Sequence, residues 1–217
     1  MSLRFRVPEM EGRTAHWYAR QRGSKNQLLA YGRQAGLLTA GLPAGAAILE
    51  IAPGPGYFAV ELARRGYRVS GLDISHTMVQ IATERARRAG LTVDFRHGDA
   101  ARLPFPDDGF ELIVCQAAFK NFREPVAALD EMHRVLRPGG VAVIQDLNRS
   151  ATRAEIAADV RGMGLSPVNA AVTRATLGWL RRRAHPAAEF TRLAARSAFG
   201  GCRISSDGLS LEVRLHG

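Results

Sequence analysis

Two glycines, Gly54 and Gly56, stand between an apolar run at residues 47–52 and a helix predicted over 57–65. Glycine allows a tight turn and lets a ligand approach the backbone closely, as a nucleotide-binding loop requires. Asp73 follows Gly56 by seventeen residues, at the end of the next predicted strand. An ionised carboxylate there can accept hydrogen bonds from both hydroxyls of a ribose. The spacing predicts a site for a nucleoside-containing cofactor, and it also matches the dinucleotide fingerprint of dehydrogenases.

Two further acidic residues fit the same kind of site. Glu50 lies in the first predicted strand, four residues before Gly54. Asp99 lies in a short turn, Gly98-Asp99-Ala100, directly after a strand predicted over 91–97. A carboxylate on such a turn can accept a hydrogen bond from an exocyclic amine of a base. The pattern therefore favours a cofactor that carries both a ribose and an aminated base.

The motifs that follow complete a family pattern. A proline-containing turn at 104–109 introduces the fourth predicted strand, and the next helix ends in the segment 134–140. With these motifs in this order, residues 45–147 resemble the class I S-adenosylmethionine-dependent methyltransferases, in the small-molecule branch that includes the ubiquinone and menaquinone C-methylases. The glycine loop departs from the commoner form because Ala52 holds its first position. We expect this to change the rigidity of the loop and not the ligand.

The resemblance implies S-adenosylmethionine as the cofactor and S-adenosylhomocysteine as the product. It implies that Asp73 holds the ribose, that Asp99 accepts from the adenine amine and that Gln116 lies near the sulfonium. Asp73 and Asp99 could instead be capping or turn aspartates, and Met78 has the spacing of a core residue. The implied cofactor residues are Glu50, Ala52, Gly54, Gly56, Asp73, Ile74, Met78, Gly98, Asp99, Ala100 and Gln116.

Few residues of the acceptor side can be chosen from the sequence. Methyl transfer is an in-line displacement, so positioning dominates, and a general base helps when the acceptor arrives protonated. The resemblance implies that N-terminal helices close over the cofactor, which makes His16 and Tyr18 catalytic candidates. Lys120 and Asn121, after the fourth strand, are also candidates, as is Asp146 at the end of the fifth. Lys120 could stabilise negative charge or simply face solvent.

The centre of the chain alternates strand and helix. Near-continuous apolar strands alternating with helices predict a parallel sheet covered on both faces. The resemblance implies an α/β fold, a Rossmann-like doubly wound sheet of seven strands with an antiparallel last strand. A hairpin signal at Asp207-Gly208 would complete that sheet. The predicted strands are 47–52, 67–73, 91–97, 110–116 and 141–146, and the predicted helices between them are 57–65, 76–88 and 124–136.

The length of 217 residues suits one domain, which we expect over 1–217. We divide it into a helical lid at 1–45, a cofactor-binding core at 46–150, and helices with a terminal hairpin at 151–217. Within the first flank, residues 12–39 predict two helices broken near Gly23-Ser24. In the last flank, helical breaks are predicted at Gly162, Gly164, Pro167 and Pro186.

The formal net charge of +10 is distributed unevenly. Residues 46–150 carry equal numbers of acidic and basic groups, whereas each flank carries an excess of five basic groups. Such flanks suit an anionic acceptor bearing a carboxylate, a phosphate or an acidic phenol, and they equally suit a solvated arginine-rich surface. The residues that could pair with such an acceptor are Arg13, Arg20, Lys120 and the run Arg181-Arg182-Arg183, whose members point in different directions on a helix.

Composition excludes several classes. Two cysteines cannot build a disulfide framework and lack zinc-site spacing, so we expect reduced thiols and no metal site. The apolar stretches are too short to cross a bilayer, and the basic N-terminus is not followed by the apolar run of a secretory signal. We therefore expect a cytoplasmic protein whose partner is a small-molecule acceptor, with its oligomeric state left open.

Three other functions compete with this interpretation. A nucleic-acid methyltransferase fits the sequence pI of about 10.8. Against it, residues 116–119 at the end of the fourth strand are Gln-Ala-Ala-Phe, where amino-group methylases usually have asparagine or aspartate, two prolines and an aromatic residue. A dehydrogenase fits the glycine loop alone. A protein that binds the cofactor without transferring a methyl group also fits, because no single residue is indispensable for the displacement.

Overall fold

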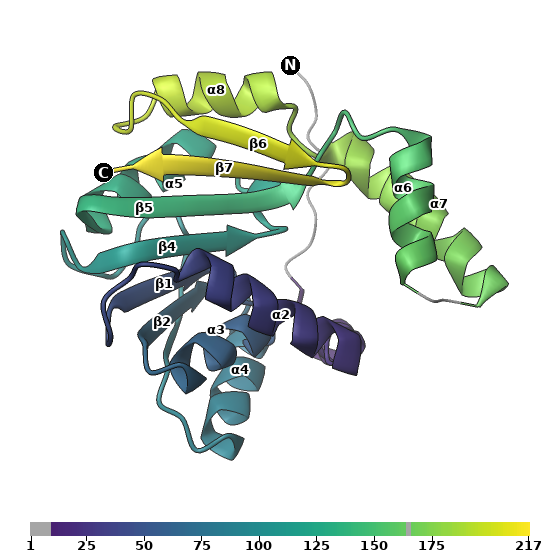
Figure 1. The fold of residues 1–217 in the computed structure, drawn as a ribbon. Helices are drawn as coiled ribbons and strands as arrows, with labels where there is room; N and C mark the ends of the chain where they lie inside the picture. Colours follow the sequence, from purple (N-terminus) through teal and green to yellow (C-terminus); the bar gives the residue numbers. More distant parts are fainter. Residues whose placement is uncertain (1–9, 164–165) are drawn as a thin grey trace.

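The computed structural model describes residues 10–163 and 166–217, which form a seven-stranded sheet with helices on both faces (Figure 1). The order across the sheet is β3-β2-β1-β4-β5-β7-β6. The strands are β1 (Ala47–Ile51), β2 (Arg68–Asp73), β3 (Asp94–His97), β4 (Phe110–Gln116), β5 (Leu136–Leu147), β6 (Arg203–Asp207) and β7 (Ser210–His216). The helices are α1 (Gly12–Gln21), α2 (Lys25–Leu38), α3 (Tyr57–Arg64), α4 (His76–Arg88), a 3₁₀ turn η1 (Phe119–Asn121), α5 (Pro125–Val135), α6 (Arg153–Gly162), α7 (Pro167–Arg183) and α8 (Ala187–Ala195).

The central strands are apolar throughout because both faces of the sheet are covered. Every residue of β1 is buried. On one face, Ile48 of β1 packs in a cluster with Phe58 of α3 and with residues of α2. On the other face, Leu129 of α5 and Phe190 of α8 join a second cluster. Burial on both faces explains why the strand sequences lack the alternation of a half-exposed sheet.

The end of the chain completes the sheet in the predicted way. β1 to β5 pair in parallel, whereas β7 pairs antiparallel with β5, with Ile144 opposite Val213. β6 and β7 form the hairpin that Asp207-Gly208 predicts, and Gly208 adopts a left-handed φ of +50°. The predicted seven-stranded, mostly parallel sheet with an antiparallel last strand is confirmed.

Helices α6 and α7 lie beyond the carboxyl ends of the parallel strands, and α2 extends toward that side from the face of the sheet (Figure 1). The predicted break at Gly23-Ser24 separates α1 from α2, and the Ser24 hydroxyl caps α2 by accepting from the backbone N–H of Gln27. The predicted breaks at Gly162, Pro167 and Pro186 fall at the ends of α6, α7 and α8. Gly164 lies outside the described residues, as do residues 1–9 of the predicted lid.

Two element boundaries differ from the sequence prediction. β5 begins at Leu136, directly after α5, although the proline and the two glycines of 137–140 predict a turn there. The turn residues form a bulge: Leu136 pairs with Phe110 and Val141 with Leu112, and Gly139 takes a φ of +78°. β3 begins at Asp94 and not at 91. None of the helices in the described ranges has the length and apolarity that crossing a bilayer demands.

Candidate active site

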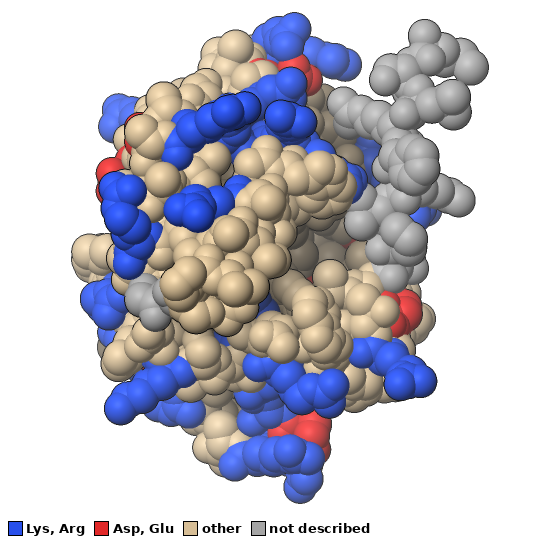
Figure 2. Space-filling view, turned by 90° about the vertical axis from the view of Figure 1, so that its right-hand side faces the viewer, with Lys and Arg blue, Asp and Glu red and all other residues tan. Residues whose placement is uncertain are grey.

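A pocket opens at the carboxyl ends of the parallel strands, the side of the molecule that Figure 2 presents. Figure 2 shows a hollow near the centre of this side, with Lys and Arg side chains above and below it. Of the predicted acceptor residues, Tyr18 and Asn121 line the pocket, whereas His16 and Lys120 do not. The predicted cofactor residues in the pocket wall are Ala52, Gly54, Asp73, Ile74, Met78, Gly98, Asp99, Ala100 and Gln116.

In the glycine loop between β1 and α3, every second residue has a left-handed backbone conformation. Ala52, Gly54 and Gly56 have φ of +57°, +54° and +75°. The Ala52 conformation costs a side-chain-bearing residue ~1 kcal/mol, and its N–H donates to the carbonyl of Leu72 at 2.8 Å. A Cβ at Gly54 would have Tyr18 Cε1 at 4.0 Å as its nearest atom, so this glycine faces the open pocket.

Gly56 faces the protein interior. A Cβ built on Gly56 would lie 2.7 Å from the Cβ of Ala82 in α4 and 3.0 Å from the ring of Phe95 in β3. The absence of a side chain at Gly56 therefore allows α4 and β3 to pack closely against the loop. The expectation that this glycine leaves space for a ligand is wrong. Its contribution to the site is the loop conformation, in which the next residue begins α3.

Asp73, the last residue of β2, joins the loop to α4. Its Oδ2 accepts the backbone N–H of Gly54 at 2.9 Å, and its Oδ1 accepts that of Ser75 at 2.9 Å. Burial raises the pKa of the Asp73 carboxyl above its ordinary value, and the Ser75 and Gly54 N–H groups oppose that rise. Each oxygen keeps a lone pair for a further donor, so the carboxylate can also accept ribose hydroxyls.

Glu50 is a buried carboxylic acid without a full set of partners. The residue is 3% exposed, and its Oε2 has no hydrogen-bond partner. Burial raises the pKa of Glu50 to about 8, with the carboxylate of Asp73 adding to the rise and the backbone of Ala59 opposing it. The side chain lies in a hollow that adjoins the pocket and shares Tyr18 and Gln116 with it. A cation bound there would satisfy Glu50.

The turn after β3 supplies the opposite end of the pocket. Asp99 Oδ1 accepts the backbone N–H of Ala101 at 3.0 Å, so the turn-forming role that the sequence left open is present in the structure. Ile74 is 37% exposed and lies in the pocket wall, where its side chain can pack on a flat ring. Met78 is buried and also reaches the wall, so it combines the core and pocket roles.

A chain of amides holds Gln116 where β4 ends. Gln116 Nε2 donates to Gln145 Oε1 at 3.2 Å, and Gln145 Nε2 donates to Glu212 Oε2 at 2.7 Å. Gln34 of α2 donates to the same Gln145 oxygen, so α2, β4, β5 and β7 meet at one side chain. Gln145, Gln34 and Glu212 were not predicted, because only the strand order brings these distant positions together.

The acceptor candidates separate into two groups. His16 lines a different hollow, which is bordered by α1, α2, α3 and α4 and also contains Arg85. Lys120 is 9% exposed and pairs with Asp146 at 2.8 Å, so the solvent-facing alternative for this lysine is wrong. The negative charge of Asp146 is therefore balanced by the lysine. Tyr18 and Asn121 remain in the pocket wall.

Two side chains that the sequence analysis did not select, Arg85 and Glu11, hold the elements around the pocket together through hydrogen bonds. Arg85 of α4 donates from Nε to the Pro55 carbonyl at 2.8 Å, and its guanidinium lies 3.4 Å from the ring centre of Tyr57. Glu11, before α1, accepts the N–H groups of His76 at 2.8 Å and Thr77 at 3.0 Å. The start of α1 is thus tied to the start of α4.

The sheet order, the left-handed loop after β1 and the acidic residues after β2 and β3 define a nucleoside-binding α/β fold. Residues 49–144 match the family model described as "Methyltransferase domain". A solved structure of an S-adenosylmethionine-dependent methyltransferase from Aquifex aeolicus has the same fold, with a TM-score of 0.68 over 92% of this chain and 96% of that one, at 18% identity. Residues 49–144 are therefore similar to methyltransferase domains, and the chain as a whole has the fold of the solved structure.

Curated relatives narrow the branch. A demethylmenaquinone methyltransferase of Deinococcus radiodurans is 40% identical over 99 residues, 45% of this chain and 41% of that protein. A ubiquinone/menaquinone biosynthesis C-methyltransferase of Neisseria meningitidis is 32% identical over 133 residues, 60% of this chain and 54% of that protein. The match thus spans about half the length of these relatives. Within the matched part, the domain resembles the quinone C-methylases.

Proposed function

We propose that this protein transfers the methyl group of S-adenosylmethionine to a small-molecule acceptor of the quinone class. The observation that carries the proposal is the set of carboxylates around one pocket, with Glu50, Asp73 and Asp99 at the ends of three neighbouring strands or in the turn that follows. The names of the matched relatives supply the acceptor class.

The residues present fit this cofactor. The unpartnered, buried Oε2 of Glu50 suits the ammonium of the methionine moiety, because a cation there would restore the ionised carboxylate. Asp73 would accept the ribose hydroxyls, and Asp99 would accept the adenine amine. When bound, S-adenosylmethionine supplies an electrophilic methyl group on a sulfonium.

The remaining residues of the pocket wall would orient the acceptor. Tyr18, Asn121 and Gln116 provide polar groups around the space next to the glycine loop. These residues would hold the acceptor's nucleophilic atom in line with the methyl group that the bound cofactor would supply, so alignment within the pocket would set the rate. An electron-rich, reduced phenolic ring is a much better nucleophile than an electron-poor oxidised quinone. We therefore propose the reduced, hydroquinone form as the acceptor.

The experiment is transfer of a radiolabelled methyl group from S-adenosylmethionine to a short-chain quinone analogue, supplied either reduced or oxidised. We expect label in the reduced analogue only, and binding of S-adenosylhomocysteine by calorimetry. Binding without transfer to either form would indicate a cofactor-binding protein without this activity. Tight NAD binding with no response to S-adenosylhomocysteine would overturn the cofactor.

We also infer how the chain is organised around this reaction. Residues 1–217 would act as one domain, with 1–45 as the lid, 46–150 as the cofactor-binding core and 151–217 as the acceptor side and the hairpin. The free thiols of Cys115 and Cys202 support a reducing, cytoplasmic location. Proteolysis of the full chain with and without S-adenosylhomocysteine tests the lid, because a lid that closes over the cofactor becomes protected.

A further inference from the structure

Helix α7 presents an apolar stripe to solvent. Val168, Val172, Ala175 and Trp179 recur at spacings of four, three and four, so they share one face of the helix. The valines are 73% and 61% exposed and Trp179 is 55% exposed. No residue of α7 is buried, although the helix runs for 17 residues. An amphipathic helix in a globular protein normally turns such a stripe inward.

The orientation of α7 is set by the opposite face. Ala170 and Leu177 pack on a small cluster formed by α6 and the β6–β7 turn, which includes Ile156 and Leu209. Those contacts partly cover the face of α7 that carries Ala170 and Leu177, and they leave the stripe of valine and tryptophan exposed. The stripe is therefore exposed because α7 packs on α6 through its opposite face.

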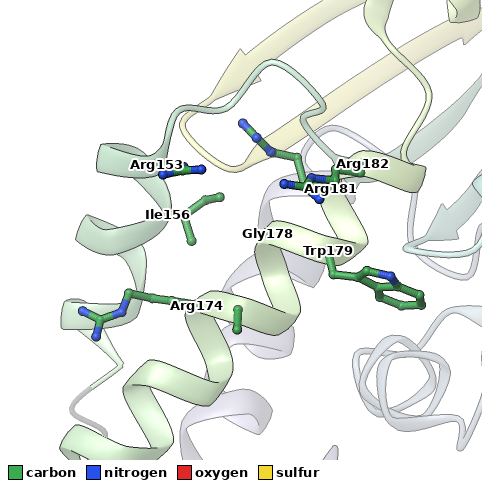
Figure 3. Close-up of a pocket in the computed structure, with 8 residues that line it drawn as sticks. Arg153, Ile156, Arg174, Gly178, Trp179, Arg181 and Arg182 are labelled. Carbon is green, nitrogen blue, oxygen red and sulfur yellow. The ribbon is translucent and has the colours of Figure 1, made fainter.

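Arginine side chains border the stripe. Arg153, Arg174, Arg181 and Arg182 line a hollow between α6 and α7 together with Trp179 (Figure 3). The hollow has no acidic residue in its wall, and none of the four guanidinium groups forms an ion pair within the described residues. Four unpaired cations around one hollow suit an anionic group.

Two neighbouring arginines add detail. Arg181 is one of the residues that line the hollow, and it donates to the Ala151 carbonyl, while its Nε is buried without a hydrogen-bond partner. Arg183 does not line the hollow, and its guanidinium carbon lies over the ring of Trp179, 5.0 Å from the ring centre. Members of the triple-arginine run thus point in different directions, as expected from their spacing. Arg181 thus retains a buried N–H donor that no protein acceptor satisfies.

We propose that the α6–α7 pair docks on the surface of an anionic phospholipid bilayer. The stripe of Val168, Val172 and Trp179 enters the boundary between headgroups and acyl chains, and a lipid phosphate occupies the arginine hollow. A helix with an apolar face bordered by arginine and an amphipathic tryptophan is the kind that lies in the plane of a bilayer interface. This proposal does not depend on methyl transfer.

The combination of features selects this occupant over others. A nucleic acid would match the arginines, but it offers nothing comparable to an acyl layer for the exposed valines. A second copy of the chain docked through a two-fold axis would place the arginines of both copies against each other. A free phosphate would fill the hollow and leave the stripe exposed. Only the bilayer surface engages the charges and the stripe together.

Vesicle binding of the full chain tests the proposal. The sequence has two tryptophans, so Trp17→Phe leaves Trp179 as the only indole reporter. We expect a blue shift of its emission, and co-sedimentation, with vesicles of mixed phosphatidylcholine and phosphatidylglycerol but not with phosphatidylcholine alone. The double variant Arg174→Gln/Arg182→Gln should weaken binding about 30-fold, the equivalent of losing two basic groups at a charged surface.

The matched control is Arg192→Gln/Arg196→Gln on and after α8, which removes the same charge elsewhere and should leave vesicle binding unchanged. Val172→Asp should also abolish the blue shift, because it places a charge in the stripe. Equal loss in the control variant would overturn the proposal, since any cationic surface would then suffice. A response to inorganic phosphate or to duplex DNA without any vesicle binding would also overturn it and would identify a free phosphate or a nucleic acid as the ligand.

Discussion

The carboxylate of Asp73 accepts the backbone N–H of Gly54 at 2.9 Å, so the end of β2 fixes the glycine loop that follows β1. The same carboxylate accepts the N–H of Ser75, which caps α4. The carboxylate that the sequence predicts to bind ribose therefore also links the glycine loop to the start of α4 by hydrogen bonds. Its replacement has consequences both for binding and for stability.

The first prediction separates those two consequences. Asp73→Asn keeps one oxygen that can accept a backbone N–H but loses the charge and the second acceptor. We expect the affinity for S-adenosylhomocysteine to fall by about 1.5–3 kcal/mol, the value of hydrogen bonds to a charged group, with a smaller loss of thermal stability. Calorimetry and thermal unfolding measure the two effects. Asp94→Asn, in the exposed pair with Arg96, is the control, and equal affinities in both variants would contradict the role of Asp73.

The second prediction compares two glycines of one loop. Gly56→Ala should destabilise the fold by about 1–3 kcal/mol, because its Cβ would overlap Ala82 and Phe95. Gly54→Ala should lose more cofactor affinity than stability, because its Cβ projects into the pocket. Both substitutions carry the same left-handed strain, so the difference between them reports the surroundings alone. Denaturant unfolding and cofactor titration should rank the variants in opposite orders.

The third prediction concerns pH. The pKa of Glu50 is about 8 in the folded chain because of burial, against an ordinary value of 4.5. The folded state therefore retains a proton that the unfolded state releases, and stability falls as pH rises from 4.5 through 8. Glu50→Gln should remove that part of the decline and stabilise the protein at pH above 8. Thermal unfolding of both proteins across this range measures it, and parallel curves would refute the buried acid.

The fourth prediction concerns Lys120 and Asp146, whose side chains are 9% and 1% exposed. Lys120→Met leaves a buried carboxylate without its cation and should cost about 3–5 kcal/mol of unfolding free energy. The double variant Lys120→Met/Asp146→Leu should recover much of that loss, since no charge remains buried. Denaturant titrations of the two single variants and the double variant give the coupling. Additive losses would show that the pair is not coupled.

Local patterns predicted most of the fold. The boundaries of α3, α4, β2 and β4 lie within one residue of the positions that apolar periodicity and capping residues predict. The bulge at the start of β5 was not predicted, because Arg137-Pro138-Gly139-Gly140 has the composition of a turn and is held in the sheet by its neighbours. The composition of a segment indicates the conformation that it prefers in isolation. Here the pairing of β5 with β4 and β7 determines the conformation instead.

The sequence predicted residues that the structure places in the pocket wall, but it did not predict the contacts between residues that lie far apart in the chain. Asp73, Asp99 and Gly54 belong to short motifs and could be chosen from spacing. The contact of Arg85 with the Pro55 carbonyl spans thirty residues, and the pair of Lys120 with Asp146 spans twenty-six. Such contacts depend on how α4 and β5 lie in three dimensions, which no local signal encodes.

The place of β7 in the sheet has a consequence for synthesis on the ribosome. β7 follows β6 in the chain, yet it lies between β5 and β6 in the sheet. While the chain is being made, the edge of β5 has no partner until β7 emerges, and an unpaired apolar edge is a template for association with other chains. The helices α6, α7 and α8 are all translated during that interval. Nascent chains paused before β7 are therefore the aggregation-prone species, and chaperone demand should be concentrated there.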